Sequence, residues 1–172
     1  MIEKNTIWKV LTMFFENPTT EFHLRELSRQ TKLSMPSIIS TTDKLNKEQL
    51  ITKKKTPFLT TTKANAKNQQ FTRLKRIFNL EQIYNSNITD DLIQEYNHPQ
   101  AIILFGSYSR GEDTETSDID IGIITHKNKN IELAPYEKKL KRKISIHEID
   151  VHKISPEFKN SIYNGIILEG AI

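Results

Sequence analysis

Two short motifs in the second half of the chain carry residues suited to phosphate and metal chemistry. Gly106 and Ser107 follow an apolar run that ends at Phe105. Ten residues separate Ser107 from Asp118, and Asp120 comes two positions after Asp118. Glycine lets backbone amides approach a ligand closely, and amides at the start of a helix favour phosphate. Carboxylates two residues apart on a strand share one face, where they repel unless a cation lies between them. The pattern predicts Mg²⁺, or Mn²⁺, held together with a nucleotide's phosphates.

Arg110 extends the first motif. Its planar cationic fork suits phosphate oxygens, which makes it a candidate nucleotide-binding residue. Pairing with the neighbouring Glu112 or Asp113 is an equally good interpretation of the same residue.

The hydrophobic pattern changes at residue 101, and from there it predicts the strands and helices that position these motifs. Continuous apolar runs there predict buried strands, and Ile119, Ile121 and Ile123 are expected on the face opposite the aspartates. Gly122 shares the aspartate face and is expected to leave room there. The strands are predicted at 101–105, 119–124, 144–154 and 165–168, with helices at 131–141 and 156–163.

The first half has a different pattern. Helices are predicted at 3–16, 22–31 and 34–49, followed by strands at 50–54 and 58–62. This order resembles a winged helix-turn-helix domain. A connecting helix over 64–86 and another over 87–97 lead to the strands. The predicted architecture is thus a two-domain α+β or α/β protein, divided into residues 1–63, 64–86 and 87–172.

The spacing Gly-Ser, ten residues, Asp-x-Asp resembles the polymerase-beta-like nucleotidyltransferase superfamily, and its surroundings resemble the minimal nucleotidyltransferase branch. The resemblance implies a mixed sheet with flanking helices. It implies transfer of a nucleoside monophosphate from a nucleoside triphosphate, with ATP as first candidate, to a hydroxyl. It also implies that Gly106 and Ser107 hold the triphosphate and that the catalytic Asp118 and Asp120 bind metal. Some members of that branch are antitoxins paired with a small helical toxin, so a toxin chain is an expected partner.

The third carboxylate of that superfamily has no clear counterpart. It usually lies on a neighbouring strand just after the helix that follows Asp-x-Asp, and here that position falls on Ser145. Asp150, five residues on, has the right apolar neighbours and is the favoured catalytic base. Ser145 and Asp150 have opposite parity on a regular strand, so only one of them faces the site. If Ser145 holds the position, we expect nucleotide binding with poor transfer.

Charge divides the chain in the same way as the hydrophobic pattern. Residues 1–76 carry a net charge of +9, whereas residues 77–98 carry −4 and residues 99–172 carry −1. The basic half predicts binding of a polyanion, double-stranded DNA first. The expected DNA-contacting residues are polar or basic side chains of the third helix and the hairpin: Ser37, Ser40, Lys44, Lys53, Lys54 and Lys55. Dimerisation or partner docking is the alternative role for this half.

Composition excludes several chemistries. The 172 residues contain no cysteine, which rules out disulfides, thiolate metal sites and a cysteine nucleophile. No apolar run reaches the roughly 18 residues that a membrane helix needs, so we expect no membrane partner and a cytoplasmic location. Because winged helices commonly bind palindromic sites as dimers, a homodimer is also an expectation.

Overall fold

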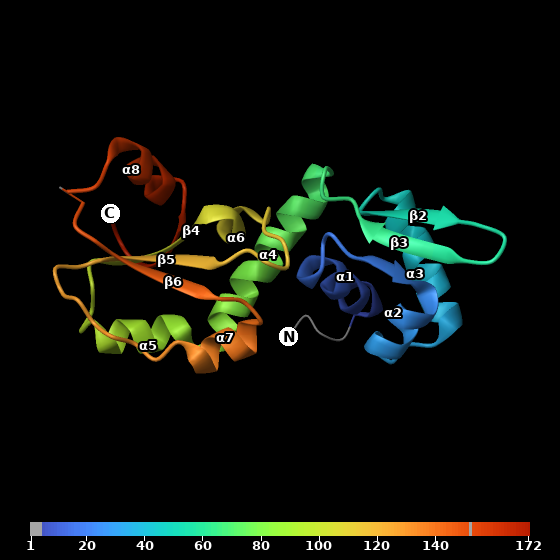
Figure 1. The fold of residues 1–172 in the computed structure, drawn as a ribbon, viewed down its shortest axis with the longest axis horizontal. Coiled ribbons are helices and arrows are strands. Elements are labelled where there is room, and N and C mark those ends of the chain that lie inside the picture. Colours follow the sequence, from blue (N-terminus) through green and yellow to red (C-terminus); the bar gives the residue numbers. More distant parts are fainter. Residues whose placement is uncertain (1–4, 152) are drawn as a thin grey trace. The chain divides into compact units, whose positions relative to one another are not determined.

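The computed structural model describes residues 5–151 and 153–172, and the chain forms two compact units, divided between Lys75 and Arg76 (Figure 1). Residues 3 and 4 of the first predicted helix lie outside the described residues. No helix in the described part of the chain is both long and apolar enough to span a membrane.

The first unit packs helices against a small antiparallel sheet whose strand order is β1-β3-β2. Its elements, in chain order, are α1 (Thr6–Glu16), β1 (Glu21–His23), α2 (Leu24–Thr31), α3 (Met35–Lys47), β2 (Ile51–Lys55) and β3 (Thr60–Ala64). The side chain of Ser34 caps α3 by accepting a hydrogen bond from the backbone N–H of Ser37, and Pro36 lies in the first turn, where no helical donor is lost.

Strand β1 was not expected, because Phe22 and His23 were assigned to a helix predicted over 22–31. Phe22 is buried between two exposed residues, but three residues are too few for this alternation to be recognised in the sequence. The strand exists because it pairs with β3, a contact between residues 40 positions apart.

Helix α4 (Gln69–Ser86) begins in the first unit and ends in the second. It falls within the predicted connecting segment 64–86 but begins five residues later. Its buried side chains include Phe71 in the first unit and Phe78, Asn79 and Ile83 in the second.

The second unit is built on a mixed four-stranded sheet of order β6-β5-β4-β7. Strands β5 and β6 are parallel, and the other neighbours are antiparallel. Its elements, in chain order, are α5 (Ile88–Glu95), β4 (Ala101–Phe105), α6 (Gly106–Arg110), β5 (Ile119–Ile124), α7 (Ala134–Leu140), β6 (Ile144–Ile149), α8 (Pro156–Tyr163) and β7 (Ile166–Gly170). The mixed sheet with flanking helices is as predicted.

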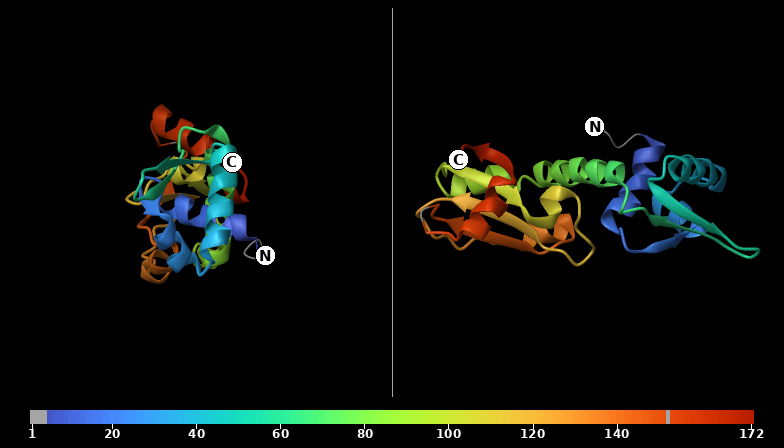
Figure 2. Two further views of the ribbon diagram at one scale, coloured as in Figure 1. Left: turned by 90° about the vertical axis from the view of Figure 1, so that its right-hand side faces the viewer. Right: turned by 90° about the horizontal axis from the view of Figure 1, so that it is seen from above.

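The two faces of this sheet bury different sets of side chains. Ile119, Ile121 and Ile123 pack in the core shared with α5 and α7, as expected. The opposite face carries Phe105 and Ile149 and is covered by α8 (Figures 1 and 2). Asp120 alternates with the three isoleucines and therefore lies on this α8 face.

Candidate active site

The site forms where β4 ends beside the start of β5. Phe105, the last residue of β4, pairs with Asp120, and Gly106 then begins α6. The turn that carries Gly106 and Ser107 is thus adjacent to the second aspartate of the Asp-x-Asp motif. The sequence motifs, separated by ten residues, meet because β4 and β5 are antiparallel neighbours.

Gly106 makes this contact sterically possible. Its φ is +73°, a left-handed conformation that costs other residues about 1–2 kcal/mol. A Cβ at this position would collide with the carboxylate of Asp120, whose Cγ would be only 3.3 Å away. Only glycine therefore lets the start of α6 approach the carboxylate so closely.

Asp120 is half-buried and has two polar neighbours on β6. Ser145 is its direct partner in the parallel register, and His147 comes two residues later on the same face. The Nε2 atom of His147 lies 3.4 Å from Oδ1 of Asp120. Gly122, opposite His147, does not leave the expected room, because Ile149, Ile162 and Phe105 fill it.

Asp118 lies one residue before β5 begins and is exposed. The strand is anchored directly after it, since the N–H of Ile119 donates to the carbonyl of Lys143 at 2.8 Å. Asp118 borders a hollow of about 370 Å³ that is also lined by Ser117, Glu137 and Lys143. Glu137 pairs with Lys143 at 3.0 Å and accepts a backbone hydrogen bond from Ile144, and these contacts hold the pKa of Glu137 below its usual value.

The segment between the two motifs is held by a buried amide. The Nδ2 atom of Asn79 donates to the carbonyl of Tyr108 at 2.8 Å and to the carboxylate of Asp113 at 2.7 Å. The hydroxyl of Ser109 donates to the carbonyl of Gly106 at 2.9 Å, inside the same short helix. These bonds fix α6 and its following loop on α4, and so fix the position of Gly106.

Arg110 pairs with Glu112, with its Nε atom 2.7 Å from Oε2. Both side chains are about half exposed, so the pair is weak and water competes with it. This is the simpler of the two interpretations drawn from the sequence, and it leaves the phosphate-binding role of Arg110 as a prediction.

Asp150 does not lie with the other site residues. It follows the last residue of β6, five positions beyond Ser145, which is about 16 Å along a strand. Its carboxylate instead pairs with Lys153 at 2.9 Å and lies 3.9 Å from His126. The register places Ser145, and not Asp150, beside Asp120, so it does not favour the alignment shifted by five residues, and the role of Asp150 as catalytic base stays a prediction.

The donors around Asp120 fit a divalent cation, although they are few. Asp118 and Asp120 supply hard carboxylate oxygens, the ligands that Mg²⁺ and Mn²⁺ accept. Among the described residues no group of three or more acidic or histidine side chains is gathered tightly enough to hold a metal ion by itself.

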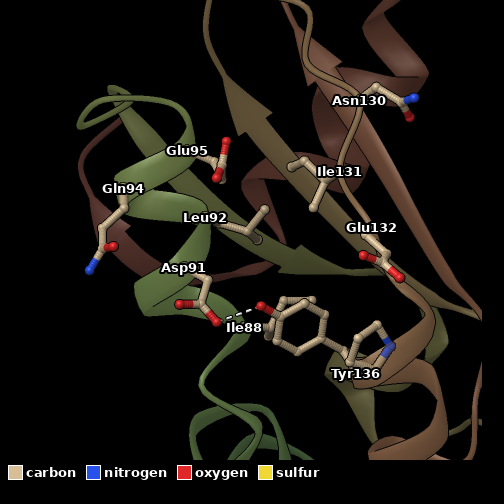
Figure 3. Close-up of a pocket in the computed structure, with 10 residues that line it drawn as sticks. Ile88, Asp91, Leu92, Gln94, Glu95, Asn130, Ile131, Glu132 and Tyr136 are labelled. Carbon is tan, nitrogen blue, oxygen red and sulfur yellow. Dashed lines mark hydrogen bonds between the residues drawn. The ribbon is translucent and has the colours of Figure 1, made fainter.

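Another hollow, of about 390 Å³, lies between α5 and the segment that enters α7 (Figure 3). It is on the sheet face opposite Asp120, and Asp91, Glu95 and Glu132 line it. The hydroxyl of Tyr136 donates to Asp91, which raises the pKa of Tyr136 to about 12. The bond ties α7 to α5 and so supports the core beneath β5.

The predicted DNA-contacting residues of the first unit fall into two groups. Ser40, Lys44, Lys54 and Lys55 are exposed, and Ser37 is partly so. Lys53 is not available in the same way: its side chain is 13% exposed and its Nζ atom lies 2.7 Å from Asp43 and 3.2 Å from the Thr42 hydroxyl. Lys53 therefore braces β2 against α3, and its contact with DNA stays a prediction.

A strand–turn–helix followed by an Asp-x-Asp strand, on one face of a mixed sheet, defines a nucleotidyltransferase-type domain. The family model described as Polymerase beta, Nucleotidyltransferase matches residues 87–172, and the chain belongs to this family. No curated protein and no solved structure matches the chain.

Proposed function

We propose that the second unit binds a nucleoside triphosphate with a divalent cation and transfers its nucleoside monophosphate to a hydroxyl acceptor. The observation that carries this proposal is the contact between the Gly106 turn and Asp120, because these are the residues that we propose bind phosphate and metal. Membership of the Polymerase beta, Nucleotidyltransferase family supports it.

Each residue has a defined task in this proposal. The Gly106 turn offers backbone amides to the triphosphate, and its N-cap residue, Phe105, has no side-chain acceptor that would compete for them. The Ser107 hydroxyl donates to a phosphate oxygen, and Asp118 and Asp120 hold the cation. A cation bound there neutralises phosphate charge and orients the reacting oxygens.

The residue at position 145 bears on the rate of nucleotidyl transfer. It lies beside Asp120, where the superfamily usually places a third carboxylate, and a neutral hydroxyl cannot take up the acceptor's proton as a carboxylate does. We therefore propose a site in which nucleotide binding is efficient and transfer is slow.

The test is calorimetric titration of ATP, GTP, CTP and UTP into the full chain, with and without Mg²⁺ or Mn²⁺. The Asp118→Asn/Asp120→Asn variant should lose metal-dependent binding. Asp150→Asn is the matched control: it makes the same change at the other end of β6, and its binding should equal that of the unaltered chain. Binding that survives the double substitution would place the nucleotide elsewhere, and loss in the Asp150 variant would restore that residue to the site.

The second candidate function is DNA binding by the first unit, which we propose is a winged helix. Its order of helices and strands and the exposed face of α3 favour this role, because Ser37, Ser40 and Lys44 follow one another at helical spacing. The exposed Lys54 and Lys55, here called the hairpin lysines, supply cations for phosphate.

The DNA proposal is tested through salt dependence. Replacing both hairpin lysines by Glu should weaken binding to a duplex and reduce the slope of log K against log salt by about 2, since each lost phosphate contact contributes about 0.9. Lys129→Glu/Lys138→Glu changes net charge equally at exposed positions of the second unit and should leave the slope unchanged. Equal effects of the two lysine pairs would show that DNA binding depends on net charge alone and not on the hairpin. A toxin partner and a homodimer stay predictions.

A further inference from the structure

A histidine on β6 lies close to the Asp120 carboxylate. His147 follows Ser145 by two residues on β6 and stands opposite Gly122 in the parallel register. Its side chain is 37% exposed and that of Asp120 is 31% exposed, so both are open to a ligand from solvent. The relation of His147 to Asp120 depends on the register of two strands that are separated by a helix, which sequence spacing does not give.

Two aromatic rings fix the orientation of the imidazole. Phe105 meets it at 5.2 Å between ring centroids, edge to face, and Phe158 lies 5.9 Å away. Phe105 ends β4 and Phe158 belongs to α8, so the histidine is packed between separate elements. The packing leaves Nε2 directed at the carboxylate oxygen, where a bound ion would meet it without rearrangement.

We propose that His147 and Asp120 bind the divalent cation together, and that the nitrogen ligand makes this site prefer a first-row transition-metal ion to Mg²⁺. The inference rests on the proposed metal-dependent nucleotide site and names the ion that site takes. It assigns His147 the ligand role that a third carboxylate would otherwise hold.

The two atoms are close enough to share an ion. The Nε2···Oδ1 separation is 3.4 Å, longer than the 2.7–3.2 Å of most N–H···O bonds. Two donors that each lie about 2.1 Å from one cation are about 3.0 Å apart at an octahedral angle and about 3.4 Å apart at a tetrahedral angle. A small movement of either side chain therefore lets both ligate one ion.

The chemistry of the donors sets the preference. Mg²⁺ demands oxygen ligands in near-ideal octahedral geometry, whereas imidazole nitrogen suits ions such as Zn²⁺, Fe²⁺ and Ni²⁺, and Mn²⁺ tolerates a nitrogen ligand better than Mg²⁺ does. Ser145 supplies no anionic oxygen beside Asp120, so the site offers one hard carboxylate fewer than expected for its family and one softer nitrogen more. Both differences lower the expected affinity for Mg²⁺.

The test measures metal binding directly, with Mn²⁺ as the probe because free Mn²⁺ is counted by its electron paramagnetic resonance signal. Mg²⁺ affinity is obtained by competition, and both are measured on the full chain with ATP and with the other triphosphates. His147→Phe keeps an aromatic ring between Phe105 and Phe158 but removes the nitrogen. It should weaken Mn²⁺ binding at least tenfold, since loss of residues that merely support a ligand costs about 10- to 100-fold. Mg²⁺ binding should change little.

The control and a second readout make the outcomes distinct. His126→Phe alters an exposed histidine next to Asp150 and should leave both metals unaffected. Pulsed resonance on the unaltered chain should detect a nitrogen coupled to bound Mn²⁺, a signal that needs no variant to fold. Absence of that coupling, or an unchanged Mn²⁺ to Mg²⁺ ratio in His147→Phe, overturns the inference. If Mn²⁺ still binds and depends on Asp118 and Asp120, the proposed function survives that result. If the unaltered chain binds neither metal with any triphosphate, both the proposed function and the role of His147 are refuted.

Discussion

The contact between Gly106 and Asp120 gives the sharpest test of how the site is built. Gly106→Ala forces an alanine into a left-handed conformation, at a cost of about 1–2 kcal/mol. The new Cβ also collides with the Asp120 carboxylate, and overpacking of this kind costs about 1–3 kcal/mol. The free energy of unfolding should therefore fall by about 2–5 kcal/mol.

A double-mutant cycle separates the two costs. In an Asp120→Ala background the colliding atoms are gone, and the Asp120 Cβ, at 3.5 Å, is at ordinary contact distance. Gly106→Ala should then cost only the backbone share, so the coupling between the two positions should be about 1–3 kcal/mol. Gly111→Ala, at the same φ of +73°, is the control for the backbone and should show no coupling to Asp120.

Urea unfolding followed by circular dichroism measures these free energies. Trp8 is the single tryptophan and lies in the first unit, so its fluorescence reports a transition that none of these substitutions should move. An equal cost of Gly106→Ala in both backgrounds would refute the contact, and with it the argument that the turn and the carboxylate form one site.

Further outcomes follow from the same structure. Ser145→Asp should raise the rate of nucleotidyl transfer and the affinity for Mg²⁺, as single-turnover assays with labelled triphosphate and metal titrations would measure; no gain in either would exclude this position for the third carboxylate. The bond to Asp91 raises the pKa of Tyr136 from 10.0 to about 12, so the folded state should lose stability as the pH rises from about 10 through 12. Tyr136→Phe should reduce that loss, as unfolding experiments across this pH range would measure. Lys53→Ala should lower the stability of the first unit, because it removes the bond to Asp43, and should change the DNA salt slope less than either hairpin lysine does; an equal change would contradict the bracing role.

The sequence predicted those parts of the fold that depend on local pattern. The apolar runs of β4 and β5 and the helix α8 lie where periodicity placed them. Strand β1 was missed because a single buried residue makes no pattern, and its pairing is decided by a distant strand.

The site shows the same division between local and distant information. The Gly-Ser and Asp-x-Asp motifs could be found by spacing alone. The choice between Ser145 and Asp150 could not, because it depends on the register of β6 against β5, which the packed core sets. The position of His147 beside Asp120 depends on the same register, and no local signal tied Lys53 to Asp43.

The two aspartates of the motif differ in backbone order, although they are only two residues apart. Asp120 is paired on both sides, with Phe105 and with Ser145, whereas Asp118 precedes the first residue of the strand. The amide of Asp120 should therefore exchange its hydrogen slowly, and that of Asp118 quickly. Fixing one residue's backbone fully costs about 1–2 kcal/mol in conformational entropy, and the strand pairing of Asp120 has met that cost before a ligand arrives. Asp118, outside the strand ladder, has more freedom to adjust its carboxylate to a ligand that Asp120 positions.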